Sequence, residues 1–109
     1  MEARKPRPPR TLLAASAEIT DLQSSREVKA QTLDVSVSGC YLEMPDPLPV
    51  RAAVRLKLTF NNSSLTVFGD VVRSEKGKGM GVKFRGLEPS QLTTLKGWFF
   101  AADRPGFGW

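Results

Sequence analysis

One short polar segment, residues 34–39 (DVSVSG), carries the residue types that could hold a polar ligand; it reads D-x-S-x-x-G. The Asp34 carboxylate and the serine hydroxyls can hydrogen-bond to nearby backbone or to a ligand, and Gly39 can adopt a positive φ without strain. The segment lies between two runs with the composition of strands, 28–33 and 40–44. Two interpretations are open on these residues alone: an ordinary turn between strands, or a binding loop built on such a turn.

A second chemical feature lies upstream, where the first ten residues hold four basic side chains against one acidic side chain. They supply most of the formal net charge of +5, and this asymmetry suggests an anionic partner, although a solvated basic tail is the commoner explanation of such a charge on its own. An arginine fork can pair with phosphate or with the O6 and N7 edge of guanine, and it can stack on a purine face. Arginines beside the polar turn could therefore form a purine-nucleotide site, with Asp34 accepting from guanine N–H groups and Gly39 admitting a base.

The residue inventory argues against an enzyme. The chain has no histidine, which removes the commonest general base and metal ligand, together with Ser-His-Asp and Cys-His arrangements. Its one cysteine cannot form an internal disulfide and argues against a Cys-based zinc site. The carboxylates are scattered, and the glycine-rich run 76–81 opens no helix, so it is no dinucleotide fingerprint. We therefore expect a binding module with neither cofactor nor metal.

Length and composition indicate one small globular domain. The chain has 109 residues, with 40% hydrophobic and 25% charged residues. No apolar run approaches the roughly 20 residues of a membrane span, and no apolar segment of a signal peptide follows the basic N-terminus. We expect a cytoplasmic protein with three parts: a flexible basic arm (1–10), a domain (11–103) and a tail (104–109).

Hydrophobic periodicity predicts the elements that must position these groups. Period-2 alternation and turn residues predict six strands at 11–20, 26–34, 40–44, 53–60, 65–74 and 80–84. Gly69 predicts a bulge or bend within the fifth strand. The alternation places Cys40 on an apolar face, which predicts a buried thiol rather than a reactive one.

The segment after the last strand has helical spacing. Pro89 suits the first turn of a helix, and Leu92, Leu95 and Phe99 form an apolar stripe, so we expect a helix from about residue 89 to 101. The whole pattern predicts a mainly β fold, a six-stranded antiparallel β-barrel of the split-barrel type with one C-terminal α-helix.

Three features in this order resemble the PilZ domain, the bacterial receptor module for cyclic di-GMP. Residues 34–39 match the family's [D/N]-x-S-x-x-G, the basic arm precedes them, and residues 79–84 (GMGVKF) are similar to the family's G-[MI]-G-V-x-F strand before the helix. The resemblance covers nearly the whole chain. It implies the barrel fold, a role in second-messenger signalling and a nucleotide ligand.

The resemblance also implies site residues. Arg7 and Arg10 would hold phosphate and stack on guanine, while Asp34, Ser36 and Gly39 would bind a guanine at the barrel surface. Binding would order the arm and create a surface for an effector protein that the sequence does not identify. Neither DNA nor RNA is expected as a partner, and no transmembrane segment is expected.

The arginine motif departs from the family's R-x-x-x-R, often written R-R-x-x-R. Arg7 and Arg10 match the later positions, but Pro6 occupies the first, where Arg4 could substitute by reaching along the arm. This departure keeps a second hypothesis open, a degenerate PilZ protein-interaction module that does not bind cyclic di-GMP. A third, a small basic barrel for RNA or single-stranded DNA, is less favoured because the outward face of 53–60 offers no aromatic platform.

Overall fold

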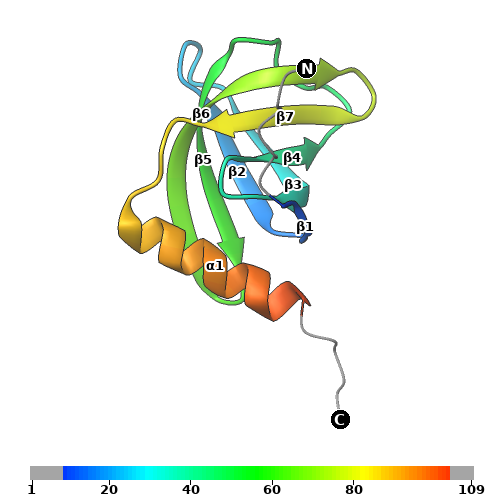
Figure 1. Cartoon of the computed structure of the whole chain (residues 1–109). Coiled ribbons are helices and arrows are strands. Elements are labelled where there is room, and N and C mark those ends of the chain that lie inside the picture. Colours follow the sequence, from blue (N-terminus) through cyan, green and yellow to red (C-terminus); the bar gives the residue numbers. More distant parts are fainter. Residues whose placement is uncertain (1–8, 104–109) are drawn as a thin grey trace, which may run out of the picture.

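The computed structural model describes residues 9–103, which form seven strands and one C-terminal helix (Figure 1). The elements are β1 (Thr11–Leu12), β2 (Ser16–Asp21), β3 (Glu27–Val35), β4 (Gly39–Glu43), β5 (Ala53–Phe60), β6 (Ser63–Glu75), β7 (Gly79–Phe84) and α1 (Pro89–Asp103). Strands β2 to β7 form a closed antiparallel barrel, and β1 is one extra short strand. The predicted six-stranded barrel with one helix is therefore confirmed.

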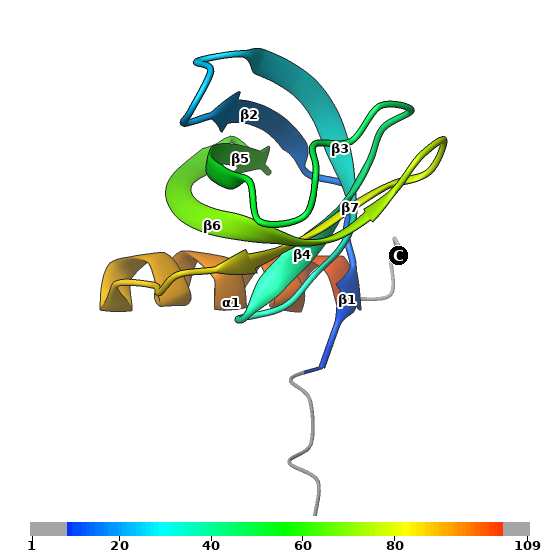
Figure 2. The ribbon, with the colours of Figure 1, turned by 90° about the horizontal axis from the view of Figure 1, so that it is seen from above.

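The barrel closes because β3 has partners on both sides. The strands follow the order β3-β2-β5-β6-β7-β4, and β4 returns to pair with β3. Every pairing is antiparallel. Closure removes the free edges that an open sheet of this size would expose. Figure 2, seen from above, shows the strands surrounding a common interior, with α1 along one side.

The barrel interior holds the apolar positions that alternation predicted. Val54, Leu56 and Leu58 of β5 are completely buried, Phe60 at the end of this strand is partly buried, and the inward residues of β4 and β7 are buried with them. The same core takes in Leu95 and Trp98 of α1. The predicted apolar stripe on the helix did not include Trp98. The ring of Trp98 packs against that of Phe60, with 5.7 Å between the ring centroids, and its indole N–H donates to Ser63 Oγ at 2.7 Å.

The prediction of one continuous strand over 11–20 is wrong, because the segment is divided into β1 and β2 with a break between them. The buried Thr32 hydroxyl donates to the Leu13 carbonyl at 2.5 Å and accepts from the Ala15 N–H at 2.8 Å. This side chain thus bridges the break, beside the backbone bonds from the Leu13 N–H to the Leu33 carbonyl and from the Thr32 N–H to the Ala15 carbonyl. The break lets β1 pair with the far end of β3, at Val35 and Asp34.

Of the two alternatives predicted at Gly69, a bulge or a bend, the bulge is wrong, since Gly69 pairs in register with both Val54 and Phe84. A Cβ at Gly69 would lie 2.6 Å from the Lys83 carbonyl oxygen, so the close approach of β7 explains the glycine. The register shifts fall elsewhere, between Thr32 and Asp34 in β3 and between Val71 and Arg73 in β6. Within residues 9–103, no helix has the length and apolar character needed to cross a membrane.

Candidate functional site

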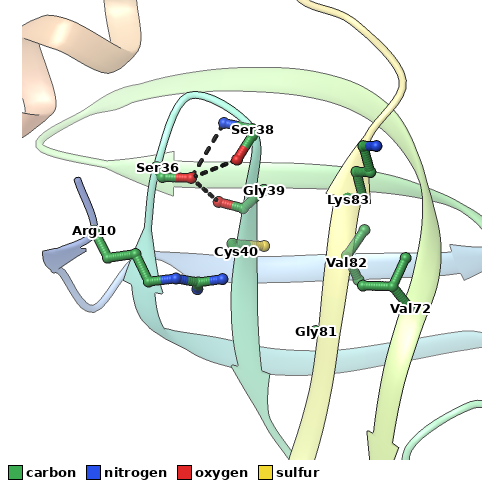
Figure 3. A pocket seen from close by; sticks show the side chains of 9 residues that line it. All are labelled: Arg10, Ser36, Ser38, Gly39, Cys40, Val72, Gly81, Val82 and Lys83. Atoms are coloured by element: carbon green, nitrogen blue, oxygen red, sulfur yellow. Dashed lines mark hydrogen bonds between the residues drawn. The ribbon is translucent and has the colours of Figure 1, made fainter. Parts of the chain in front are cut away.

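The D-x-S-x-x-G segment joins β3 to β4 as a tight turn. Its first backbone bond runs from the Ser36 N–H to the Gly39 carbonyl at 2.8 Å. The Ser36 side chain is only 2% exposed, and its hydroxyl accepts from the Ser38 N–H at 3.1 Å (Figure 3). It also contacts the Ser38 hydroxyl at 3.1 Å and donates to the Gly39 carbonyl at 3.4 Å. The hydroxyl of Ser36 therefore fixes the shape of the turn.

Gly39 is required for a different reason from the one expected. Its φ is not in the positive range, so the turn does not use the freedom of glycine to adopt a left-handed conformation. A Cβ at this position would lie 2.2 Å from the Val82 carbonyl oxygen, closer than two such atoms can approach. Beside it, the Phe84 N–H donates to the Ser38 carbonyl at 2.8 Å. Glycine thus lets the turn lie directly against β7.

Arg10 and Asp34 are in direct contact at the start of β1. The Arg10 Nη1 donates to Asp34 Oδ1 at 2.6 Å, and the two side chains are 51% and 18% exposed. The pairing of Leu12 with Asp34 in the β1–β3 ladder brings the two residues together. An exposed ion pair of this kind contributes about 0–1 kcal/mol, so a competing anion can replace the carboxylate at small cost.

Two adjoining cavities lie on the outer wall formed by β3, β4, β7 and β6. The first cavity has a volume of about 400 Å³, and its lining residues are Arg10, Ser36, Ser38, Gly39, Cys40, Val72, Gly81, Val82 and Lys83 (Figure 3). The second has a volume of about 840 Å³ and shares Arg10, Val72 and Gly81 with the first. Its other lining residues are Leu33, Asp34, Tyr41, Glu43, Arg73, Glu75, Gly77 and Lys78. Both volumes fall within the range of small-molecule sites.

The structure thus brings together every sequence-predicted site residue that it describes. Arg10, Ser36 and Gly39 line the first cavity, and Arg10 and Asp34 line the second. Arg4 and Arg7 lie outside the described residues.

Sequence reasoning missed the part of the site contributed by β6 and β7. Alternation along β7 places Lys83 on the outer face, but its place beside the D-x-S-x-x-G turn depends on the β4–β7 register. Arg73 and Lys78 add further positive charge around the second cavity, which Glu43 and Glu75 also line. Alternation alone could identify these side chains as outward-facing, but not as neighbours of the turn.

Glu75 fixes the positions of two side chains that line the second cavity, Tyr41 and Arg73. The Tyr41 hydroxyl donates to Glu75 Oε1 at 2.5 Å, and Arg73 Nη2 donates to Glu75 Oε2 at 3.1 Å. The hydrogen bond to Glu75 raises the pKa of Tyr41, and the same bond lowers the pKa of Glu75. At neutral pH the tyrosine is therefore a neutral donor and the glutamate an ionised acceptor.

Cys40 lies at the floor of the first cavity but is 2% exposed. Burial, followed by the nearby Asp34 carboxylate, raises the pKa of its thiol to about 12. The predicted burial is confirmed. A neutral, buried thiol packs as a small apolar group and is not a nucleophile at neutral pH.

Comparisons with known proteins give a family match and similar solved structures. The family model described as "PilZ domain" matches residues 3–101. A similar solved structure is the PilZ domain of CeSA from a cellulose synthesizing bacterium, with a TM-score of 0.67 and 19% identity over 85% of this chain and 96% of that chain. Another is the Bacillus subtilis inhibitor of motility MotI/DgrA, with a TM-score of 0.71 and 13% identity. That match covers 91% of this chain and 51% of the other chain. No curated protein matched the sequence.

Proposed function

The chain belongs to the PilZ domain family, and from that premise we propose that it is a receptor module for cyclic di-GMP. Members of this family are binding and adaptor modules and generally serve as receptors for this nucleotide. The observation that carries the proposal is the contact between Arg10 and Asp34. One group suited to phosphate and one suited to a guanine edge lie 2.6 Å apart, beside two open cavities.

In the proposed binding step, Arg10 exchanges the Asp34 carboxylate for a ligand phosphate. The ion pair that is lost and the phosphate contact that is gained are both charge-assisted hydrogen bonds of the same arginine, so the exchange itself is close to neutral in free energy. The exchange frees Asp34 to accept hydrogen bonds from the N–H groups of a guanine. Lys83, at the far wall of the first cavity, adds positive charge that favours the phosphates.

Ser36 and Gly39 support this site through the backbone. The buried Ser36 hydroxyl and the close packing of Gly39 against β7 hold the turn beside Asp34 in one shape. A pre-shaped loop loses little conformational entropy when a ligand binds. Arg7 would add a second phosphate contact from the arm, and Arg4 is a further candidate.

The signal would leave the site through β1. This strand follows the arm directly, pairs with β3 at Asp34, and lies against α1. A ligand that draws Arg10 away from Asp34 would thus reposition the arm at the edge of β3, where an effector protein could recognise it. Such a receptor would act in the bacterial cytoplasm, and it would not be an enzyme.

A second candidate function is a PilZ protein-interaction module that does not bind the nucleotide. The observation in its favour is Pro6, which occupies the first position of the family's arginine motif. The similarity to a solved structure described as an inhibitor of motility is compatible with a role in protein interaction.

Calorimetric titration of the chain with cyclic di-GMP separates the two candidates. The receptor proposal expects saturable binding that Arg10→Ala weakens and that Arg26→Ala leaves unchanged. Arg26 is a matched control, since it is an exposed arginine in the β2–β3 loop, outside both cavities. Absence of binding by the wild type at millimolar ligand would reject the receptor and favour the interaction module.

A further inference from the structure

An exposed aromatic side chain lies on the outer wall formed by β5 and β6, outside both cavities of the candidate site. Phe68 is 46% exposed, whereas its strand neighbours Val67 and Gly69 are buried. The alternation of β6 thus turns the Phe68 ring outward, and the packing of the core does not require an aromatic residue there. Aromatic side chains are enriched at the centres of protein interfaces.

Two arginines flank Phe68 on the neighbouring strands. Arg55 lies directly opposite Phe68 in the β5–β6 ladder, and on the other side the backbone N–H of Arg85 donates to the Phe68 carbonyl at 2.9 Å. The Arg85 guanidinium is fixed by two bonds to the Asp70 carboxylate, at 2.8 and 3.1 Å. Because this contact uses two of its five N–H donors, the remaining donors of Arg85 can bind a partner.

Arg55 carries a charge that its neighbours in the sheet do not balance. It lies opposite Thr20 of β2 and Phe68 of β6, both uncharged, and no carboxylate in the described part of the chain forms an ion pair with it. Glu18 and Glu27 line a hollow of about 360 Å³ with Arg55, but they belong to β2 and β3, on the side away from Phe68. The surface around Phe68 therefore complements an acidic partner.

The spacing of the two arginines fits the repeat of an α-helix. Two interstrand spacings, roughly 10 Å in all, separate Arg55 from Arg85 across β6. Residues i and i+7 of a helix are about 10.5 Å apart on one face, with residue i+4 between them. The side chains on one face of an extended segment are about 6.8 or 13.6 Å apart, which fits the two arginines less well.

The same wall is poorly suited to a single-stranded nucleic acid. Surfaces that bind such strands combine stacking aromatic rings with a continuous cationic groove. Among the described strands β2, β5 and β6, Phe68 is the one exposed aromatic residue, and the carboxylates of Glu18, Glu27 and Asp70 interrupt the positive charge. A protein partner is therefore the better match.

We propose that Phe68, Arg55 and Arg85 form a docking surface for an acidic amphipathic helix of a partner protein. We name it the Phe68 surface. An apolar side chain of the helix would pack on the Phe68 ring, and acidic side chains on either side of it would bind the two arginines. The surface lies outside both cavities, so its occupation requires no nucleotide. The inference goes beyond the proposed receptor function and applies equally to an interaction module.

An NMR titration of the isotope-labelled chain with a designed peptide tests the proposal. The probe is an alanine-based helical peptide of about 15 residues, with glutamate at positions i and i+7 and leucine at position i+4. Saturable shifts are expected at the amides of Arg55, Phe68 and Arg85. Peptides with serine in place of the leucine, or with lysine in place of both glutamates, should bind about tenfold more weakly or less.

Two variants of the chain test the same contacts from the other side. Phe68→Ser and Arg55→Glu should each weaken binding of the probe about tenfold or more. Val50→Ser and Arg26→Glu are matched controls at exposed loop positions outside the Phe68 surface, and they should bind the probe as the wild type does. None of the four positions lines either cavity, so calorimetry should give wild-type binding of cyclic di-GMP in all four variants.

The outcomes separate this surface from the receptor function. Unchanged binding of the probe by Phe68→Ser and Arg55→Glu, or no shifts at millimolar probe, would reject the Phe68 surface and leave the receptor function standing. Shifts of the same amides by an oligothymidylate, in preference to the peptide, would also reject it and would assign the wall to nucleic acid. If the wild type binds the probe but no cyclic di-GMP, the receptor function is rejected and the Phe68 surface is supported.

Discussion

The Arg10 guanidinium donates to the Asp34 carboxylate across the β1–β3 ladder, at a distance of 2.6 Å and a sequence separation of 24 residues. The contact joins the basic arm to the D-x-S-x-x-G turn, and it places the two groups in the positions from which each could reach a different part of one nucleotide. The first two predictions depend on this pair, and the others test the geometry of the surrounding wall.

Replacing Arg10 should affect ligand binding more than replacing Arg4. Arg10 lines both cavities and occupies a position that matches the family motif, whereas Arg4 does not match it. We expect Arg10→Ala to cost roughly 1.5–3 kcal/mol, or about ten- to a hundredfold in Kd for cyclic di-GMP by calorimetry. Equal effects of the two substitutions would contradict the assignment of Arg10.

Asp34→Ala should weaken cyclic di-GMP binding without changing its dependence on salt. Asp34 would accept from a base edge and neutralise no phosphate, whereas Arg10 would neutralise one. The slope of log Kd against log salt concentration should therefore be flatter for Arg10→Ala and unchanged for Asp34→Ala. Titrations at several potassium chloride concentrations measure both slopes. Unchanged binding in both variants would place the ligand elsewhere.

Gly39→Ala should destabilise the fold, whereas Gly81→Ala should not. The added Cβ at Gly39 would overlap the Val82 carbonyl oxygen, and the backbone on neither side can yield easily. Overpacking of this kind costs about 1–3 kcal/mol in the free energy of unfolding, measurable by denaturant titration. The Cβ at Gly81 meets only ordinary contacts, so this variant serves as the matched control. A stable Gly39→Ala protein would show that β4 and β7 can separate at this point.

Tyr41 is the only tyrosine in the chain, so its ionisation can be followed directly by ultraviolet absorbance. The hydrogen bond to Glu75 raises the pKa of Tyr41 above its ordinary value of 10.0. Glu75→Ala should remove this bond and return the titration midpoint toward 10.0. An unchanged midpoint would contradict the Tyr41–Glu75 contact.

The hydrogen bond between Tyr41 and Glu75 also makes the stability of the fold depend on pH. The pKa of Glu75 is lowered below 4.5 in the folded chain, chiefly by the bond from Tyr41. Its contribution to stability is therefore present above pH 4.5 and is lost as the pH falls through the folded pKa. The pKa of Tyr41 is raised, so its contribution is present below pH 10 and is lost as the pH rises through the folded pKa. Tyr41→Phe should weaken both dependences.

The sequence by itself determined the helix and every strand from β3 to β7 with its inward face, but not the break between β1 and β2. Period-2 alternation reports which side chains turn toward the core, and this is a local property that β5 and β7 show clearly. The D-x-S-x-x-G turn and Arg10 were also found from the sequence, because their residue types and order resemble a known family. The prediction of a buried Cys40 depended on the same alternation, and it was confirmed.

The tertiary structure alone decided which outward side chains are neighbours. Closure of the barrel sets the register between β4 and β7, and this register brings Gly81 and Lys83 beside the turn. The bulges that redirect Leu33 and Val72 depend on how two strands pair, so no pattern within one strand could place them. Gly39 shows the same distinction. The sequence shows that this residue is a glycine of a known motif, but it does not show why glycine is needed there. The reason is the close approach of the Val82 carbonyl, which belongs to a strand more than forty residues away.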